Sequence, residues 1–172
     1  MKNIVKLVIA IVLVAMCNNV SAQNLKLAHI SKQDLIVSMP EYETAMAQFQ
    51  KIQEDLGKNL EEMQVEYRRK YEEFSKNQET WTDLVKQSKL DEIQSMERRI
   101  GAFQESAQES LQQDYNRLLQ PVIEKADKAI EAVAKEQGVT YVIEANPQIL
   151  IFKAVGTLDL LPAVKQHLGI KN

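Results

Sequence analysis

Residues 39–138 form a stretch of about a hundred residues with apolar side chains at helical spacing and very few helix-breaking residues. Three breakers interrupt the interior of this stretch, namely Gly57, Gly101 and Pro121. An isolated glycine inside a strongly periodic helix costs only about 1 kcal/mol. The stretch therefore predicts one long helical hairpin, and the short segments on either side of it must be organised around that hairpin.

The apolar residues of both halves recur every three or four positions in an eleven-residue pattern. In the first half, Phe49, Leu60 and Tyr71 occupy equivalent positions. Such a repeat corresponds to about 3.67 residues per turn, so the apolar stripe runs nearly straight along the helix instead of winding a left-handed supercoil. The second half repeats this spacing from Ala107 to Val133. Two matching stripes predict that the two helices pack against each other.

The apolar pattern lapses in residues 77–82, and we place the tip of the hairpin there. A Ser or Thr followed three residues later by an acidic residue can satisfy free amides at the start of a helix. Thr80 with Asp83 is one candidate start for the return helix. Ser88 with Asp91 is a second candidate.

Pro121 interrupts the return leg near the point where the first leg, starting near Pro40, has no further residues to pair with. A proline removes one backbone donor and crowds the preceding turn, so we expect it either to kink the helix or to start a new one. We therefore divide the chain into an arm at residues 41–120 and a body made of residues 23–40 and 121–172.

Residues 1–22 have the organisation of a cleaved secretory signal peptide. Two lysines precede an apolar run shorter than the roughly 20 residues of a membrane span, and Ala22 suits signal-peptidase cleavage before Gln23. Cys17 offers an alternative as a lipidated cysteine, but Met16 stands where a small residue normally precedes such a cysteine. Cleavage before Gln23 leaves a mature chain without cysteine, which excludes disulfides and cysteine nucleophiles.

The charges of the chain concentrate in the predicted hairpin. Residues 41–136 carry 21 Asp and Glu against 14 Lys and Arg, a net charge of −7. A nucleic-acid site needs a basic excess to neutralise phosphates, so no nucleic-acid partner is expected. The sequence also has no glycine-rich phosphate loop, and its two histidines, His29 and His167, lack metal-binding spacing. We therefore predict no enzyme, no metal site and no cofactor.

The segment before the hairpin predicts one strand and one short helix. Apolar and other residues alternate over residues 25–30, which favours a strand. Ser31 is suited to start a short helix. Pro40 fits the first turn of the long helix, where Glu41 complements the positive helix end.

The segment after the hairpin predicts two more strands and a last helix. Gly138 is the expected left-handed stop of the hairpin, and residues 139–144 alternate as a β-branched and aromatic strand. The dipeptide Asn146-Pro147 is a strong turn signal before the apolar run 149–152, so the pair is expected to form an antiparallel β-hairpin. A short helix from 162 to 168 completes the chain.

A sheet this small has open edges and too little core to be stable alone, so the chain should oligomerise. The expected fold class is α+β, with a long antiparallel helical hairpin, or coiled-coil tentacle, on a small antiparallel β body that oligomerises. Contacts between copies are expected from the strands and from residues 122–133 of the return leg. Within the body, the expected contact residues are Leu27, Ile30, Tyr141, Ile143, Leu150 and Phe152.

The signal peptide, the strand and short helix ending in Met39-Pro40-Glu41, the charged hairpin, the Gly138-Val-Thr-Tyr-Val-Ile-Glu-Ala strand and the Asp159-Leu-Leu-Pro-Ala-Val-Lys tail occur in this order. This order resembles the Skp/OmpH family of periplasmic chaperones over the whole mature chain. The resemblance implies a jellyfish-shaped homotrimer, with a β body and three helical tentacles. Their cavity would hold unfolded outer-membrane β-barrel proteins without ATP.

Two features depart from this family pattern. Members usually carry a hydroxyl residue as the cap of the last helix where this chain has Leu161, so Pro162 and Asp159 must start that helix here. The best-known members are basic and attract lipopolysaccharide electrostatically. The mature chain instead has 19 Lys and Arg against 24 Asp and Glu, a net charge of −5, which argues against lipopolysaccharide binding by that route.

Four aromatic residues gather toward the distal end of the arm and are the candidate client-binding residues: Tyr67, Tyr71, Phe74 and Trp81. Two interpretations stay open for the first three, which either fill the seam between the legs or contact an unfolded client. No third element is available to cover Trp81 at the tip. An alternative function is an envelope-anchored structural spacer without clients, which lipidation of Cys17 would favour.

Overall fold

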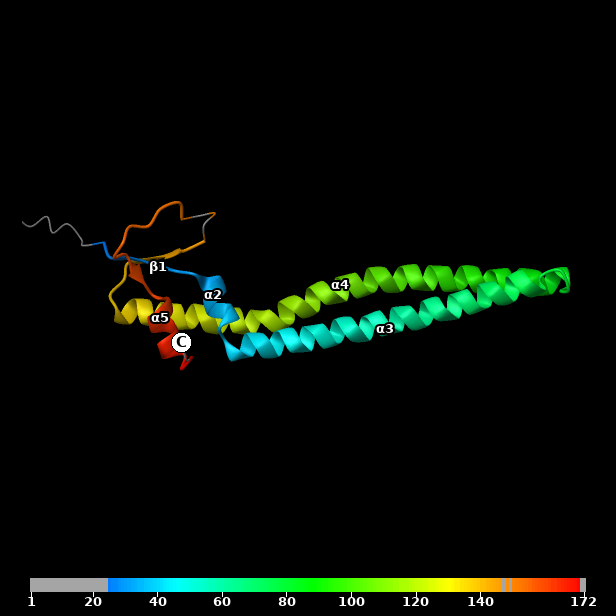
Figure 1. Ribbon diagram of the computed structural model, residues 1–172, viewed down its shortest axis with the longest axis horizontal. Coiled ribbons are helices and arrows are strands. Elements are labelled where there is room, and N and C mark those ends of the chain that lie inside the picture. Colours follow the sequence, from blue (N-terminus) through cyan, green and yellow to red (C-terminus); the bar gives the residue numbers. More distant parts are fainter. Residues whose placement is uncertain (1–24, 147, 149, 171–172) are drawn as a thin grey trace, which may run out of the picture.

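The computed structural model describes residues 25–146, 148 and 150–170. Figure 1 shows two long helices, α3 (Pro40–Asn77) and α4 (Asp83–Glu136), that run side by side away from a small body at one end. This arrangement confirms the predicted α+β class with its long helical hairpin. The body contains the remaining elements, β1 (Leu27–Ile30), α2 (Lys32–Val37), β2 (Tyr141–Glu144), β3 (Leu158–Asp159) and α5 (Leu161–His167).

Residues near the starts of α2, α3 and α5 explain why these helices begin where they do. The Ser31 hydroxyl accepts a hydrogen bond of 3.2 Å from the amide of Asp34 at the start of α2. Pro40 is the first residue of α3, where its missing N–H leaves no bond unmade. At α5, Asp159 Oδ1 accepts a hydrogen bond of 2.9 Å from the amide of Leu161. Asp159 thus serves the start of α5, as expected for a helix without a hydroxyl cap.

The chain reverses direction at the tip between Asn77 and Asp83. The 38 residues of α3 correspond to a leg about 57 Å long. Neither candidate start of the return helix is correct, because the residue that precedes α4 is Thr82. Thr80 instead uses its hydroxyl within the turn, where it donates a hydrogen bond of 2.7 Å to the carbonyl of Asn77. The second candidate, Ser88, lies inside α4.

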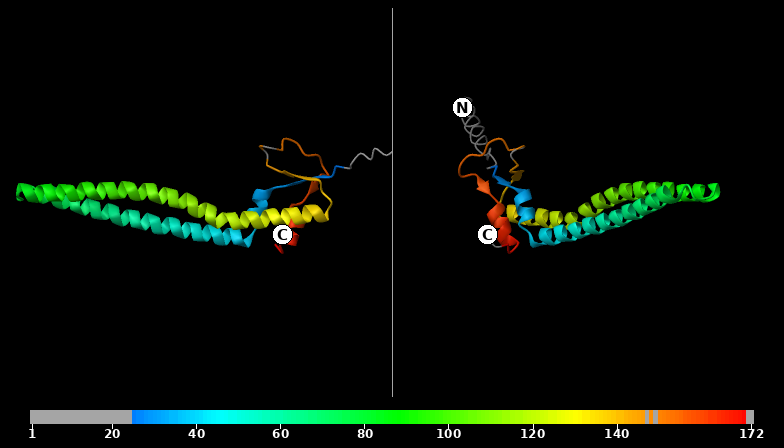
Figure 2. Two further views of the ribbon diagram at one scale, coloured as in Figure 1. Left: turned by 180° about the vertical axis from the view of Figure 1, so that it is seen from behind. Right: turned by 45° about the vertical axis from the view of Figure 1, so that its right-hand side comes forward.

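The return leg α4 is a single helix of 54 residues that continues through Pro121. The alternative of a new helix starting at Pro121 is therefore wrong. Both views in Figure 2 and the view in Figure 1 show that α4 is bent, with a change of direction in its yellow-green part where the arm leaves the body. A proline that cannot supply its amide hydrogen bond is a recognised cause of such a bend.

The three strands form one sheet with β1 in the centre, in the order β2-β1-β3. β1 runs parallel to both neighbours, with Leu27 opposite Tyr141 and His29 opposite Asp159. The predicted antiparallel β body is therefore wrong. Between β1 and β2 the whole hairpin carries the chain out and back to the end where it began. A connection of that kind lets two strands pair in parallel, which a tight turn does not.

The third strand lies at a different place in the chain from the one predicted from the sequence. Residues 150–152 are not part of a strand, so the predicted hairpin with residues 141–144 does not form; Pro147 and Ile149 lie outside the described residues. The chain instead continues through a loop to Leu158–Asp159, on the other side of β1. A strand of two residues is too short to leave a recognisable pattern in the sequence.

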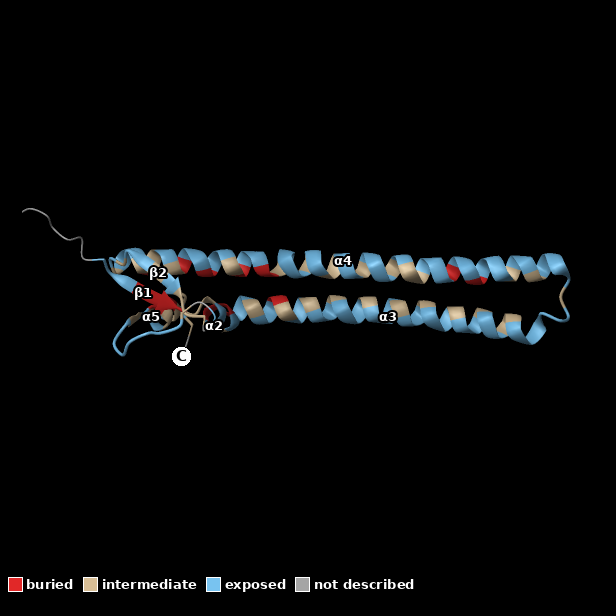
Figure 3. Cartoon of the chain, turned by 90° about the horizontal axis from the view of Figure 1, so that it is seen from above, coloured by how far each residue is buried: buried red, intermediate tan, exposed pale blue. Residues whose placement is uncertain are grey.

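The hydrophobic core lies where the sheet, the proximal part of α4 and the short helices meet. Ala28 and Ile30 point from the inner face of β1 into this core, and Leu35, Leu160 and Val164 are fully buried there. The stripe that α4 contributes consists of Leu119, Val122, Ala126, Ala129 and Val133. Figure 3 shows this buried region on the body and a second, smaller one on the distal part of α4.

Candidate functional surfaces

The seam between the legs of the arm contains the predicted apolar stripe. Along α3 the stripe residues from Phe49 to Phe74 are half-buried, with Tyr71 as the exposed exception. Near the body, the rings of Phe49 and Tyr115 meet edge to face with centroids 5.3 Å apart. The eleven-residue pattern therefore describes the contact between the two helices correctly.

Polar and charged side chains also join the legs in the distal half of the arm. Lys70 on α3 pairs with Glu92 on α4 at 2.8 Å, and Glu73 pairs with Lys89 at 3.1 Å. The neighbouring Lys70 amino group holds the pKa of the Glu92 carboxyl below its ordinary value. Because these pairs are solvated, each contributes little to stability.

The four aromatic candidates for client contact differ in their environment. Tyr67 donates a hydrogen bond of 2.6 Å from its hydroxyl to Glu97 across the seam, and Tyr71 stacks on it with 55% of its surface exposed. Trp81 is half-buried at the tip, with its ring 6.0 Å from that of Phe74. Of the four aromatic residues, Tyr71 is thus the one presented to solvent.

The first turns of α4 carry exposed apolar residues that the sequence pattern did not predict. Leu84 is 82% exposed, and Val85 and Leu90 are also exposed, on other sides of the helix because each residue turns by about 100°. These residues fall outside the regular steps of three and four, and this departure was the signal that could have revealed them. Together with Tyr71, they are the exposed apolar residues of the distal arm that we call the tip patch: Tyr71, Leu84, Val85 and Leu90.

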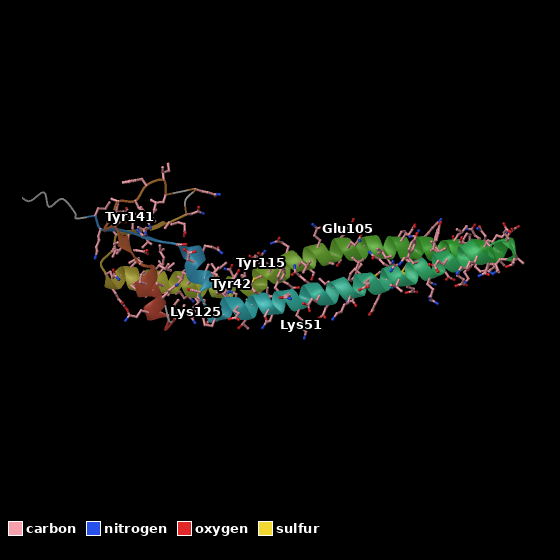
Figure 4. The ribbon with its side chains drawn as sticks, viewed as in Figure 1. Tyr42, Lys51, Glu105, Tyr115, Lys125 and Tyr141 are labelled. Carbon is pink, nitrogen blue, oxygen red and sulfur yellow. The ribbon has the colours of Figure 1, made fainter. Side chains whose placement is uncertain are left out.

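Two ion pairs lie where the long helices meet the body. Lys125 on α4 pairs with Glu41 in the first turn of α3, and Lys32 on α2 pairs with Asp127 at 2.6 Å. The hydrogen bond from Lys125 lowers the pKa of the Glu41 carboxyl. Figure 4 labels Lys125 and Tyr42 at this junction. The junction therefore combines charged pairs on the surface with the core beneath them.

A second apolar surface lies on the face of the sheet that is turned away from α4. Leu27, Tyr141 and Ile143 are exposed on this face, and Figure 4 shows Tyr141 at the side of the body away from the arm. The loop that follows β2 adds the exposed side chains of Ile151, Phe152 and Val155. We call this set the outer sheet face: Leu27, Tyr141, Ile143, Ile151, Phe152 and Val155.

The six residues expected to form contacts between copies do not share one environment. Leu27, Tyr141, Ile143 and Phe152 belong to the outer sheet face, and half-buried Leu150 lines a pocket of about 200 Å³ beside them. Ile30 is different, because it is 2% exposed and packs within the core of its own chain. Its alternation along β1 places it on the inner face, so it is not available to another copy.

Other classes of site find no support in the described part of the chain. No group of three or more His, Cys, Asp or Glu residues in residues 25–146 and 150–170 is placed to hold a metal ion. None of the described helices has the length and apolar character needed to cross a membrane.

This architecture matches that of a known protein family. The family of outer membrane proteins described as OmpH-like matches residues 26–168, which is most of the chain. The chain belongs to the OmpH-like family. The match begins just before β1 and ends just after α5, so it includes the body and the whole arm of this OmpH-like protein.

A solved structure has the same fold as this OmpH-like chain. It is the crystal structure of a proposed outer membrane chaperone (OmpH-like) from Caulobacter crescentus, with a TM-score of 0.69 and 14% sequence identity. The similarity covers 83% of this chain and 82% of the other. A comparison with curated proteins found no match.

Proposed function

We propose that this OmpH-like protein is an ATP-independent holdase chaperone of the periplasm, which captures unfolded outer-membrane β-barrel proteins between its helical arms. A holdase binds an unfolded chain in preference to the aggregated state and so lowers the concentration of free unfolded protein. Such binding needs accessible apolar groups on a surface that an extended chain can reach. Membership of the family, together with the name of the Caulobacter structure, supports the chaperone assignment.

The observation that carries the proposal is the exposure of the tip patch on an arm that is otherwise densely charged. Tyr71 and Leu84 expose most of their side chains at the end of the arm farthest from the body. Many acidic and basic residues surround them and keep the arm soluble. A few weak apolar contacts on a charged, solvated scaffold suit reversible capture of an unfolded chain.

The proposal includes assembly into a homotrimer through the outer sheet face. Phe152 is 79% exposed and Tyr141 is 59% exposed on this face, and both are large apolar side chains on one side of a body. Contiguous exposed apolar surface of this kind marks an interaction site in soluble proteins. Three copies joined there would direct three arms away from a shared body, with a cavity between them.

The location of the protein is part of the proposal. Residues 1–22 carry the predicted signal peptide and lie outside the described residues. Mass spectrometry of the purified mature protein should find Gln23 at the N-terminus. An acylated Cys17 would instead support the envelope-anchored spacer, which needs no client.

The arm can be tested by removing its distal half. A variant that lacks Met63 to Gln104, with the ends joined by a short Gly/Ser turn, retains the body and the junction. We expect this variant to sediment as a trimer and to fail to suppress aggregation of an unfolded outer-membrane β-barrel. Protection equal to that of the full-length protein would show that clients bind to the body and not to the arm.

A second experiment tests the tip patch without shortening the arm. The triple variant Tyr71→Gln, Leu84→Gln and Val85→Thr removes exposed apolar surface and keeps Tyr67 and Phe74 in the seam, although it also removes the ring that stacks on Tyr67. We expect the sedimentation and the melting temperature to stay close to those of the wild type, while aggregation of the client increases at equal chaperone concentration. A matched control is the variant Glu61→Gln and Glu62→Gln, on exposed acidic positions of α3. Equal protection by the triple variant and the wild type would rule out the tip patch as the capture surface.

A further inference from the structure

His29 lies buried at the centre of the small sheet. It is the third residue of the central strand β1 and is 6% exposed. Ala28 and Ile30 point into the core, so the alternation along β1 turns the His29 ring to the outer face. The loop from Leu150 to Thr157 covers the ring there and, together with Ile143 of β2, lines the same pocket. The ring therefore sits between the sheet and a loop that carries much of the outer sheet face.

The hydrogen bonds around the ring determine which nitrogen carries the proton. His29 Nε2 is 3.1 Å from the hydroxyl oxygen of Thr157. The Thr157 hydroxyl donates its single proton to the carbonyl of Ala154, also at 3.1 Å. Its oxygen is then left as an acceptor for His29. The neutral ring is therefore protonated at Nε2, and Nδ1 carries a lone pair.

Nδ1 of His29 is the buried side-chain nitrogen that has no hydrogen-bond partner within the described residues. Its nearest charged neighbour is Oδ1 of Asp159, the register partner of His29 on β3, at 3.9 Å. This distance is longer than a hydrogen bond, and neither atom carries a proton in the neutral state. The carboxylate is held in place because the same Oδ1 accepts the amide of Leu161.

The charged groups around His29 come from two elements. β3 contributes the Asp159 carboxylate, and the covering loop contributes Lys153, which lines the same pocket. β2 faces the ring with Ile143, which has no charge. An added proton on the ring would therefore meet one acid directly and one lysine across the pocket.

We propose that His29 is an acid-closed latch that fastens the covering loop and β3 onto β1. Protonation of Nδ1 changes a buried acceptor without a partner into a donor that faces a carboxylate, and such charge-assisted bonds are roughly twice as strong as neutral ones. The imidazolium then bonds Thr157 and Asp159 at the same time. The latch therefore closes when acid adds this second proton to the ring. This latch goes beyond the proposed function, because its closing requires no client.

The first test observes the ring nitrogens directly by NMR. Long-range proton–nitrogen spectra of the full mature protein contain signals from only two histidines, and the variant His167→Gln assigns them. At pH 8 we expect the tautomer protonated at Nε2, and at pH 5.5 a ring protonated on both nitrogens. In Asp159→Asn the ring should require lower pH to gain its second proton. A ring protonated at Nδ1 at pH 8, or an unchanged titration in Asp159→Asn, would overturn the proposal.

The second test measures the coupling between the two side chains. His29→Gln retains a donor for Thr157, and Asp159→Asn retains the oxygen that accepts the amide of Leu161. The melting temperatures of the wild type, both single variants and the double variant form a cycle at pH 5.5 and at pH 8. We expect changes that are non-additive by several degrees at pH 5.5 and additive at pH 8. Changes that are additive at both pH values would exclude the latch. His167→Gln is the control, and sedimentation of each sample excludes a change in oligomeric state as the cause.

Discussion

The hydroxyl of Tyr67 on α3 donates a hydrogen bond of 2.6 Å to the Glu97 carboxylate on α4. This bond connects the two legs near Ile93 and Met96, which are buried in the distal half of α4. It also raises the pKa of Tyr67 above its ordinary value, because the Glu97 carboxylate accepts a hydrogen bond from the protonated phenol and so disfavours loss of the proton. Tyr67, which the sequence suggested as a candidate for client contact, thus connects the two legs of the arm.

The variant Tyr67→Phe should loosen the distal seam at neutral pH, since it removes the hydroxyl and keeps the ring. The hydrogen bond requires the protonated phenol. Its contribution to stability is therefore present below the unfolded-state pKa of about 10 and is lost as the pH rises through the higher pKa of the folded state. Ultraviolet titration of the wild type should show one phenol that ionises late, and this phenol should be missing in Tyr67→Phe.

Tyr71→Phe is the matched control, because Tyr71 is exposed on the same helix. Hydrogen exchange of the distal amides should increase in Tyr67→Phe and stay unchanged in Tyr71→Phe. Equal exchange in both variants at pH 7 would contradict a role of the Tyr67–Glu97 bond in closing the seam.

The variant Leu160→Ala should destabilise the body strongly. Leu160 is fully buried between β3 and α5, and truncating such a side chain typically costs about 2–5 kcal/mol through lost burial and a residual cavity. Urea unfolding should report this loss at neutral pH. Leu84→Ala at the exposed tip removes the same atoms and should change the free energy of unfolding by less than about 0.5 kcal/mol. Similar losses for both variants would show that the core is not where the structure places it.

The variant Gly101→Ala should stabilise the arm. A Cβ atom added at Gly101 meets no other atom within 4 Å, and alanine is favoured over glycine in a helix interior by roughly 0.5–1 kcal/mol. The melting temperature should therefore rise. Gly138→Ala is the contrasting variant, because Gly138 has a φ of +63° at the end of α4, which costs other residues about 1–2 kcal/mol. A lower melting temperature for Gly101→Ala would mean that close packing requires the glycine.

Local sequence was sufficient to predict the elements whose stability is local. The eleven-residue spacing from Phe49 to Phe74 predicted which face of α3 meets α4, because helix geometry converts spacing directly into position on a face. Ser31 and Asp159 marked two helix starts through hydrogen bonds to residues near them in the chain, and Pro40 marked a third because a proline fits the first helical turn. The family could likewise be inferred from the sequence, since the order of helices and strands along the chain could be predicted from local patterns.

The tertiary structure alone decided the sheet and the environment of individual side chains. An apolar run such as residues 149–152 beside a turn signal has the same local pattern whether it forms a strand or not. The sequence therefore did not predict the parallel order β2-β1-β3, which depends on where the long hairpin brings the chain back to the body. Ile30 and Tyr141 look equally apolar in the sequence, yet one lies in the core and the other is exposed, because pairing register assigns each to a face. His29 faces Asp159 only because a two-residue strand closes beside it, and contacts between residues 130 positions apart leave no periodic signal in the sequence.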